Sequence, residues 1–121
     1  MKKRILVVDD EEKLRRVIEL HLLSAGFDVD KARSAEEALK LVEAHSGQID
    51  LLLTDAIMPG KSGLELANMM VAKQPGLPVI VMSGYTEENL SISGLTEPPA
   101  MLQKPFTPRD LRRRIREVLD R

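Results

Sequence analysis

Residues 49–63 read I-D-L-L-L-T-D-A-I-M-P-G-K-S-G, and the predicted fold is arranged around this stretch. The apolar run at 51–53 is typical of a parallel strand that is buried on both faces. Asp55 follows the run, and a helix is expected to begin at Ser62. Ligands of open α/β sheets bind beyond the carboxyl ends of the strands, which would place Asp55 at a functional edge. On this stretch alone, an ordinary turn-forming aspartate is an equal alternative.

The rest of the chain alternates apolar strands with amphipathic helices. Besides the central strand at 50–54, strands are expected at residues 5–8, 27–31, 78–82 and 100–103. Helices are expected from the acids at 9–12 to Gly26, from a Ser34–Glu37 capping box, from Ser62 to about Lys73, weakly at 87–93, and from Thr107 onward. Strict alternation implies a parallel sheet with helices on both faces. The prediction is one doubly wound α/β domain, residues 1–121, with five strands and five helices.

The first helix repeats apolar residues at spacings of three and four. Its predicted inner face consists of Leu14, Val17, Ile18, His21, Leu22 and Ala25. Such a stripe is wide enough to pack the helix against the sheet.

The composition is that of a soluble globular domain. The 121 residues are 43% hydrophobic and 31% charged, contain no cysteine and carry a formal net charge of −1. No apolar run approaches the ~20 residues of a membrane span, and the N-terminus lacks a signal-peptide core. Near-neutral charge and few aromatic residues give no basis for direct nucleic-acid binding. Without cysteine a disulfide framework is excluded, and we expect a cytoplasmic protein.

Polar side chains follow four of the predicted strands. Asp9 and Asp10 follow the first strand, and the strands that come later lead into Asp55, Ser83 and Lys104. If the first and third strands are neighbours, the three acids converge. Two carboxylates ~4 Å apart repel by roughly 4 kcal/mol at an effective dielectric of ~20. Raised pKa values or a bound cation would relieve that repulsion, and an oxygen-only cluster favours Mg²⁺ or Mn²⁺.

A carboxylate, a divalent cation, a lysine and a hydroxyl are the components of a phosphoryl-transfer site. Asp55 would supply the nucleophile, Lys104 a positive charge for a phosphoryl oxygen, and Ser83 a hydroxyl donor. Each residue alone has an ordinary explanation, as a helix cap, a turn residue or a solvated strand end. Complementary groups at the ends of four different strands favour the phosphoryl-transfer site.

Together these motifs resemble the response-regulator receiver domain. The resemblance rests on D-D at 9–10, on the stretch around Asp55, on V-M-S-G at 81–84 and on K-P-F at 104–106, and it covers essentially the whole chain. It implies a flavodoxin-like fold with strand order 2-1-3-4-5. The phrases S-G-Y-T-E-E and L-Q-K-P-F-T-P-R-D-L also look like receivers attached to hybrid histidine kinases.

The resemblance implies a phosphoacceptor switch of two-component signalling, with no turnover of an external substrate. Asp55 would accept a phosphoryl group from a histidine kinase or a histidine phosphotransfer protein, and the resulting conformational change would control an output partner that the sequence does not identify. The resemblance further implies that Mg²⁺ is held by Asp9, Asp10, Asp55 and the backbone carbonyl of Ile57. Lys104 would pair with the phosphoryl oxygen, and Ser83 would move in to bond it.

Two features depart from the family pattern. Met101 stands three residues before Lys104, where the family usually has an aromatic side chain that turns inward. Residues 87–93 have modest helix propensity. A flexible methionine fills different positions with little energetic difference, so a switch built on Met101 should be shallow. We predict that residues 84–94, which include Tyr85 beside the site, respond more strongly to phosphorylation.

Two other classes of protein share part of this chemistry. Known magnesium-dependent phosphatases with an aspartyl nucleophile carry D-x-D after the first strand and usually a cap over the site, whereas this chain has adjacent acids at 9–10 and no room for a cap. A flavin-binding electron carrier needs a loop rich in Ser, Thr and Gly there, and this loop has four acids at 9–12. A turnover assay and an absorbance spectrum would separate the three classes.

Overall fold

The computed structural model describes residues 2–44, 48–84 and 100–120 of the chain. Its centre is a parallel sheet whose strands are β1 (Arg4–Val8), β2 (Asp28–Ala32), β3 (Leu51–Asp55), β4 (Val79–Ser83) and β5 (Ala100–Gln103). The strand order is β2-β1-β3-β4-β5, which confirms the order implied by the resemblance. Three predicted strands, at 27–31, 50–54 and 78–82, are each displaced by one residue, a difference within the usual spread at strand ends.

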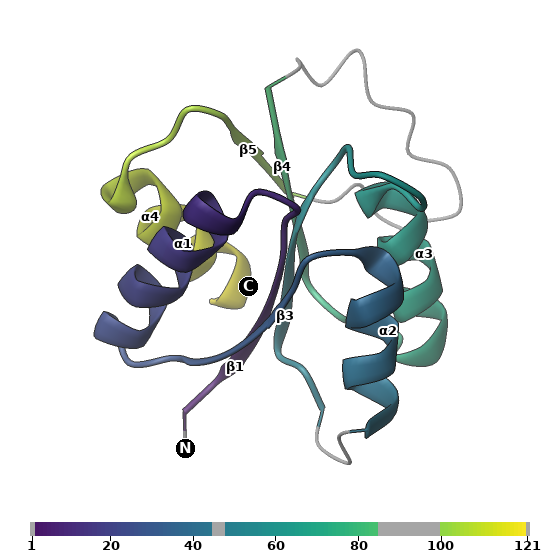
Figure 1. Cartoon of the computed structure of the whole chain (residues 1–121). Coiled ribbons are helices and arrows are strands. Elements are labelled where there is room, and N and C mark those ends of the chain that lie inside the picture. Colours follow the sequence, from purple (N-terminus) through teal and green to yellow (C-terminus); the bar gives the residue numbers. More distant parts are fainter. Residues whose placement is uncertain (1, 45–47, 85–99, 121) are drawn as a thin grey trace.

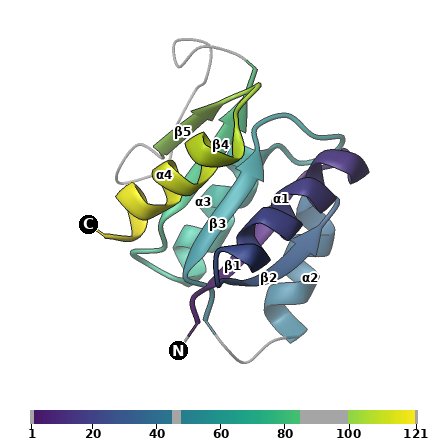
Figure 2. The ribbon, with the colours of Figure 1, turned by 90° about the vertical axis from the view of Figure 1, so that its left-hand side faces the viewer.

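Helices cover both faces of this sheet. Within the described ranges they are α1 (Glu12–Ser24), α2 (Ala35–Ala44), α3 (Gly63–Lys73) and α4 (Pro108–Leu119). In Figure 1, α1 and α4 lie on one side of the sheet and α2 and α3 on the other. Figure 2 shows α1 and α4 in front of the strands. None of the helices in these ranges has the length and apolar character to cross a membrane.

The prediction of five helices is corrected to four for the part of the chain that the structure describes. The remaining helix was expected at 87–93, which lies outside the described residues. Its prediction relied on strand–helix alternation, because the local sequence has only modest helix propensity.

Alternate residues of the central strands enter two separate cores. The core beneath α2 and α3 contains Leu6, Val8, Leu52, Val81, Ala35, Ala38, Leu66 and Ala67. The core beneath α1 and α4 contains Ile5, Val7, Leu51, Leu53, Ile18, Leu22, Leu111 and Ile115. Because side chains of a strand alternate between its two faces, one apolar run supplies both cores. The ends of β1 and β3 are therefore held by packing on both sides.

Side-chain caps begin α3 and α4, as the sequence predicted. Ser62 Oγ accepts a hydrogen bond from the backbone N–H of Glu65 (3.1 Å), and the Glu65 carboxylate accepts from the Ser62 N–H (3.2 Å). Thr107 and Asp110 form the same reciprocal pair, with both bonds at 3.0 Å. Each box satisfies donors that a helix leaves unpaired at its start.

Two predicted details of the other helices differ. On α1, Val17 is 48% exposed and Ala25 is exposed, because the helix buries a narrow stripe and ends at Ser24. At α2, Ser34 Oγ accepts from the Glu37 N–H (3.1 Å), but the Glu37 carboxylate accepts from the N–H of Arg33 (3.3 Å). Of the two hydrogen bonds of the predicted capping box, the structure therefore shows the one from the Glu37 N–H to Ser34 Oγ.

Candidate functional site

The carboxyl ends of β1 and β3 bring three acids together. Val8 pairs with Thr54 across the two strands, so the residues that follow, Asp9 and Asp55, lie side by side. One carboxylate oxygen from each of Asp9, Asp10 and Asp55 lies within 4.8 Å of the others. Asp9 is fully buried, Asp55 is half-buried and Asp10 is exposed. The predicted convergence of the three acids is confirmed.

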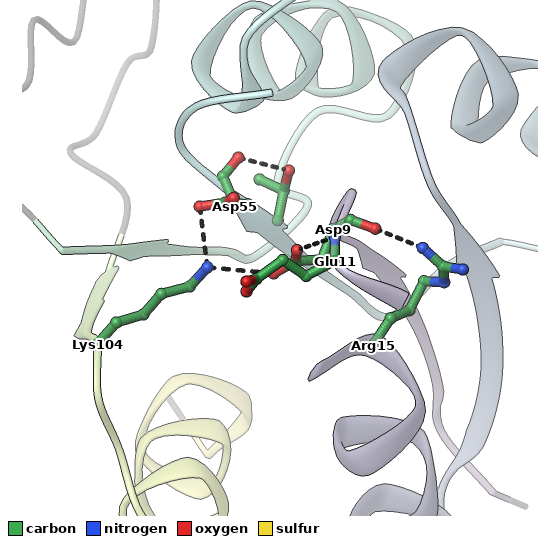
Figure 3. Close-up of polar contacts among 6 residues, drawn as sticks. Asp9, Glu11, Arg15, Asp55 and Lys104 are labelled. Atoms are coloured by element: carbon green, nitrogen blue, oxygen red, sulfur yellow. Dashed lines mark hydrogen bonds and ion pairs between the residues drawn. The ribbon is translucent and has the colours of Figure 1, made fainter. Parts of the chain in front are cut away.

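Lys104 reaches this acidic cluster (Asp9, Asp10 and Asp55) from the end of β5. Its Nζ lies 3.3 Å from Asp9 Oδ2 and 3.4 Å from Asp55 Oδ1, so one ammonium group bridges two strands (Figure 3). The backbone N–H of Lys104 donates to the carbonyl of Ser83 (2.8 Å), which ties it to the end of β4. The sheet therefore fixes the backbone of Lys104, from which the side chain extends to the cluster.

Every polar group of Asp9 has a partner. Its N–H donates to the carbonyl of Ala32 (3.2 Å), and its carbonyl accepts from Arg15 Nη1 (2.7 Å). Its Oδ1 accepts from the N–H of Glu11 (2.8 Å), and its Oδ2 faces Lys104. A buried carboxylate is costly unless it is paired in this way. Asp9 is consequently the rigid member of the cluster.

The charges of the site do not balance around Asp55. Burial raises the pKa of the Asp55 carboxyl above its ordinary value, Lys104 opposes the rise, and Asp9 and Asp10 add to it. Burial disfavours the charged form of Lys104, but Asp9 and Asp55 outweigh it and raise the pKa of the lysine. Burial is the main cause of the raised pKa of Asp55, and the cluster itself sets three acids against one ammonium group.

The donor set of the acidic cluster suits a hard divalent cation. Its groups are carboxylate oxygens, and the exposure of Asp10 opens the cluster to the water molecules that Mg²⁺ retains. Three acids against one lysine leave an excess of acidic groups, which favours a positive ion there. Ile57, whose backbone carbonyl was expected as a further ligand, follows β3 by two residues, and its side chain is 57% exposed.

The other residues predicted to act in the switch lie around this edge or outside the described ranges. Ser83 is the last residue of β4 and only 2% exposed. Met101 pairs with Val81 in the sheet and packs, half-buried, against the core beneath α2 and α3. Tyr85 lies outside the described residues.

Gly63, Thr54 and Arg15 also shape the site, although sequence reasoning gave them no role. A Cβ at Gly63 would overlap the backbone carbonyl oxygen of Asp55, so glycine lets α3 begin against β3. Thr54 Oγ1 donates to that same oxygen (3.0 Å). A glycine directly after the Ser62 cap could have indicated that α3 begins close to the end of β3. Nothing in the local sequence indicated a role for Arg15.

Comparisons with known proteins show which family this chain resembles. The family model of the response regulator receiver domain matches residues 5–116. The chain is 33% identical to the alkaline phosphatase synthesis transcriptional regulatory protein PhoP of Bacillus subtilis, and 34% identical to the regulatory protein VanR of Enterococcus faecium. Each alignment covers 100% of this chain but only 50% and 52% of those proteins. The chain therefore spans about half the length of these relatives.

Solved receiver structures share the whole fold. The CheY-like receiver domain protein from Methanospirillum hungatei JF-1 is 34% identical with a TM-score of 0.86, over 99% of this chain and 95% of that one. The receiver domain of the hybrid histidine kinase CckA is 35% identical with a TM-score of 0.80, over 96% and 98%. This chain belongs to the response regulator receiver domain family, and it is a phosphoacceptor switch of two-component signalling.

Proposed function

We propose that Asp55 is the phosphoacceptor, and that its donor is the phosphohistidine of a histidine kinase or a histidine phosphotransfer protein. The observation that carries the proposal is the position of its carboxylate. It ends the central strand, 3.4 Å from Lys104 Nζ and within 4.8 Å of oxygens from two other acids. Asp9 has similar neighbours but is fully buried, whereas Asp55 is half-buried and open to a donor.

The transfer forms one bond and breaks one. A carboxylate oxygen of Asp55 attacks phosphorus, and the bond between phosphorus and the imidazole nitrogen of the donor breaks. The nitrogen keeps the electron pair, and Asp55 becomes an acyl phosphate. Lys104 pairs with a phosphoryl oxygen in exchange for its contact with Asp55, and the Ser83 hydroxyl donates to another.

The proposed cation is Mg²⁺ or Mn²⁺, with ligands from Asp9, Asp10, Asp55 and the backbone carbonyl of Ile57. When bound, the ion supplies positive charge to the phosphoryl oxygens. The meeting of three acids with a single lysine supports the assignment. The chain contributes orientation: the N–H of Glu11 holds Asp9 Oδ1, and the sheet places Asp55 opposite.

The domain's proposed role is regulatory. It would assist the phosphorylation and dephosphorylation of its own Asp55 without turning over an external substrate. Its output would be a conformational change read by a partner, which could be another region of a longer chain or a separate protein. The support is that the site carries its own acceptor carboxylate among the groups that stabilise phosphoryl oxygens.

Acetyl phosphate and intact-protein mass spectrometry test the acceptor. With Mg²⁺, the chain should gain one phosphoryl group that is labile to base, and Asp55→Asn should gain none. Asp50→Asn is the matched control, because Asp50 lies at the opposite end of the same strand, where it accepts from the N–H of Arg4 (2.7 Å). Undiminished phosphorylation of Asp55→Asn, with peptide mapping that excludes a neighbouring Asp or Ser, would refute the assignment.

A further inference from the structure

Arg15 lies beside the acidic cluster and has no part in the chemistry above. Its Nη1 donates a hydrogen bond of 2.7 Å to the backbone carbonyl of Asp9. Figure 3 shows Arg15 and Lys104 approaching Asp9 from opposite sides. Helical side chains lean toward the N-terminus of their helix, so Arg15 on the first turns of α1 folds back over the preceding loop. The guanidinium therefore links α1 to the loop at 9–11.

Two features of the loop at 9–11 make a further stabilising contact important. It carries like charges, and Asp10 and Glu11 are exposed to solvent. Glu11 is the N-cap of α1 but makes no side-chain capping bond. The N–H of Arg15 donates to the carbonyl of Glu11 (3.0 Å), and its guanidinium holds the carbonyl of Asp9. The bond from the N–H is the ordinary first bond of the helix, whereas the bond from the guanidinium depends on arginine and ties the end of β1 to α1.

A positive charge at this position has two effects of opposite sign on a cation at the cluster. As a charge, the guanidinium repels the cation, so removing it should tighten binding. As an anchor, it holds the loop that presents Asp9 and Asp10, so removing it should weaken binding. The sign of the change in affinity therefore distinguishes the two roles.

We propose that Arg15 is a positioning residue of the phosphorylation site, whose bond to the Asp9 carbonyl fixes the loop so that Asp9 and Asp10 face Asp55. The inference rests on the proposed Mg²⁺ site and extends it to a residue that contacts neither the ion nor the phosphoryl group. Arginine suits the task because its planar fork of donors is rigid and always charged. Anchoring outweighs repulsion because the loop carries two of the three acids.

Calorimetric titration of the whole chain with Mg²⁺ tests the proposal through Arg15→Met, which keeps the aliphatic stem and loses the donors and charge. Its matched control is Arg16→Met on the same helix, where the side chain is exposed. Arg15→Met should weaken Mg²⁺ binding about tenfold, the lower end for groups that orient metal ligands. Arg16→Met should bind as tightly as the unmodified chain or slightly more tightly. Arg15→Lys should fall between the unmodified chain and Arg15→Met.

Amide hydrogen exchange without Mg²⁺ gives a second measurement that does not depend on the ion. Arg15→Met should exchange faster at residues 10–12 while residues 51–53 stay protected. If Arg15→Met loses protection at 51–53, its fold is disturbed, and the folded variant Arg15→Lys is used instead. Weaker Mg²⁺ binding by Arg15→Lys than by the unmodified chain then supports the inference, and unchanged binding overturns it. Equal or tighter binding by Arg15→Met than by Arg16→Met also overturns it. No Mg²⁺ binding by the unmodified chain overturns the proposed function instead.

Discussion

Burial makes the charged form of the Asp55 carboxyl unfavourable at the carboxyl edge of the sheet. Burial raises the pKa of its carboxyl from the ordinary 3.8, Lys104 lowers it in part, and Asp9 and Asp10 raise it further. The folded state therefore holds the Asp55 proton more tightly than the unfolded state does. The tighter binding of this proton stabilises the folded state fully at pH values below the ordinary pKa. The stabilisation is lost as pH rises through the raised pKa.

Asp55→Asn should accordingly unfold at a higher urea concentration than the unmodified chain at neutral pH with a chelator present. The gain should shrink as pH falls through the raised pKa and vanish below the ordinary pKa of 3.8, where the unmodified carboxyl is protonated in both states. Asp50→Asn, at the other end of the strand, should show no such gain. A lower midpoint for Asp55→Asn at neutral pH would mean that attraction to Lys104 outweighs burial.

Lys104→Ala should separate stability from metal affinity. Without Mg²⁺ it should lower the free energy of unfolding by about 1–3 kcal/mol, because the buried Asp9 carboxylate loses its partner at Oδ2. Mg²⁺ should bind at least as tightly, because a competing positive charge is gone, while the response to phosphorylation should weaken.

Urea unfolding and calorimetry on the same sample measure both effects of Lys104→Ala. Lys73→Ala is the control, because Lys73 is half-exposed and pairs with Glu43 (3.7 Å) away from the acidic cluster. Tighter Mg²⁺ binding after Asp10→Ala, together with weaker binding after Lys104→Ala, would reverse the proposed roles.

At the scale of elements, the start of α4 follows Lys104 by a few residues and is set by its capping box. The N–H and hydroxyl of Thr107 and the guanidinium of Arg113 hold the pKa of the Asp110 carboxyl below its ordinary value. These contacts with the charged Asp110 carboxylate stabilise the folded state at pH values above the ordinary pKa. The stabilisation is lost as pH falls through the lowered pKa of Asp110. The box therefore secures the helix at neutral pH.

Thr107→Ala should lower the free energy of unfolding by about 1 kcal/mol at neutral pH, since it removes a helix cap. The loss should diminish in acid, because the Asp110 carboxylate that completes the box becomes protonated there. Ser24→Ala, exposed at the other end of a helix, should leave stability nearly unchanged. A loss that is equal at neutral and acidic pH would show that Asp110 takes no part.

At the scale of the whole molecule, the switch depends on which segment the phosphoryl group reorganises. Met101 packs half-buried in β5, with Val81 as its neighbour on β4. Most of residues 84–94 lie outside the described ranges, and their sequence predicts a helix of low intrinsic stability. We therefore keep the prediction that the signal passes mainly through 84–94.

Beryllofluoride with Mg²⁺, as a mimic of the phosphoryl group, should change amide exchange at 84–94 more than at 100–103. Asp55→Asn treated in the same way should show neither change, which controls for binding elsewhere. Unchanged protection at 84–94 with a clear change around Met101 would instead assign the switch to β5.

Local sequence was enough to predict most of the helices and strands and the polar residues at their ends. Local sequence predicted every strand of the described residues to within one residue at each end. Ser62 and Thr107 predicted the starts of α3 and α4, because a capping box involves residues only three positions apart. The family motifs singled out Asp55 and Lys104, and their approach required only the parallel order of the strands. Of the five predicted helices the structure describes four, and the one predicted mainly from alternation, at 87–93, lies outside the described residues.

Contacts between segments that are distant in the sequence could not be predicted, because they depend on how the elements pack. The overlap of a Gly63 Cβ with Asp55, and the bond from Arg15 to the Asp9 carbonyl, depend on how closely a helix approaches a strand end. The exposure of Val17 likewise follows from how α1 sits on the sheet, although its spacing suits the inner face. Hydrophobic periodicity reports which side of an element is apolar, but distances between elements are set by packing across the whole domain.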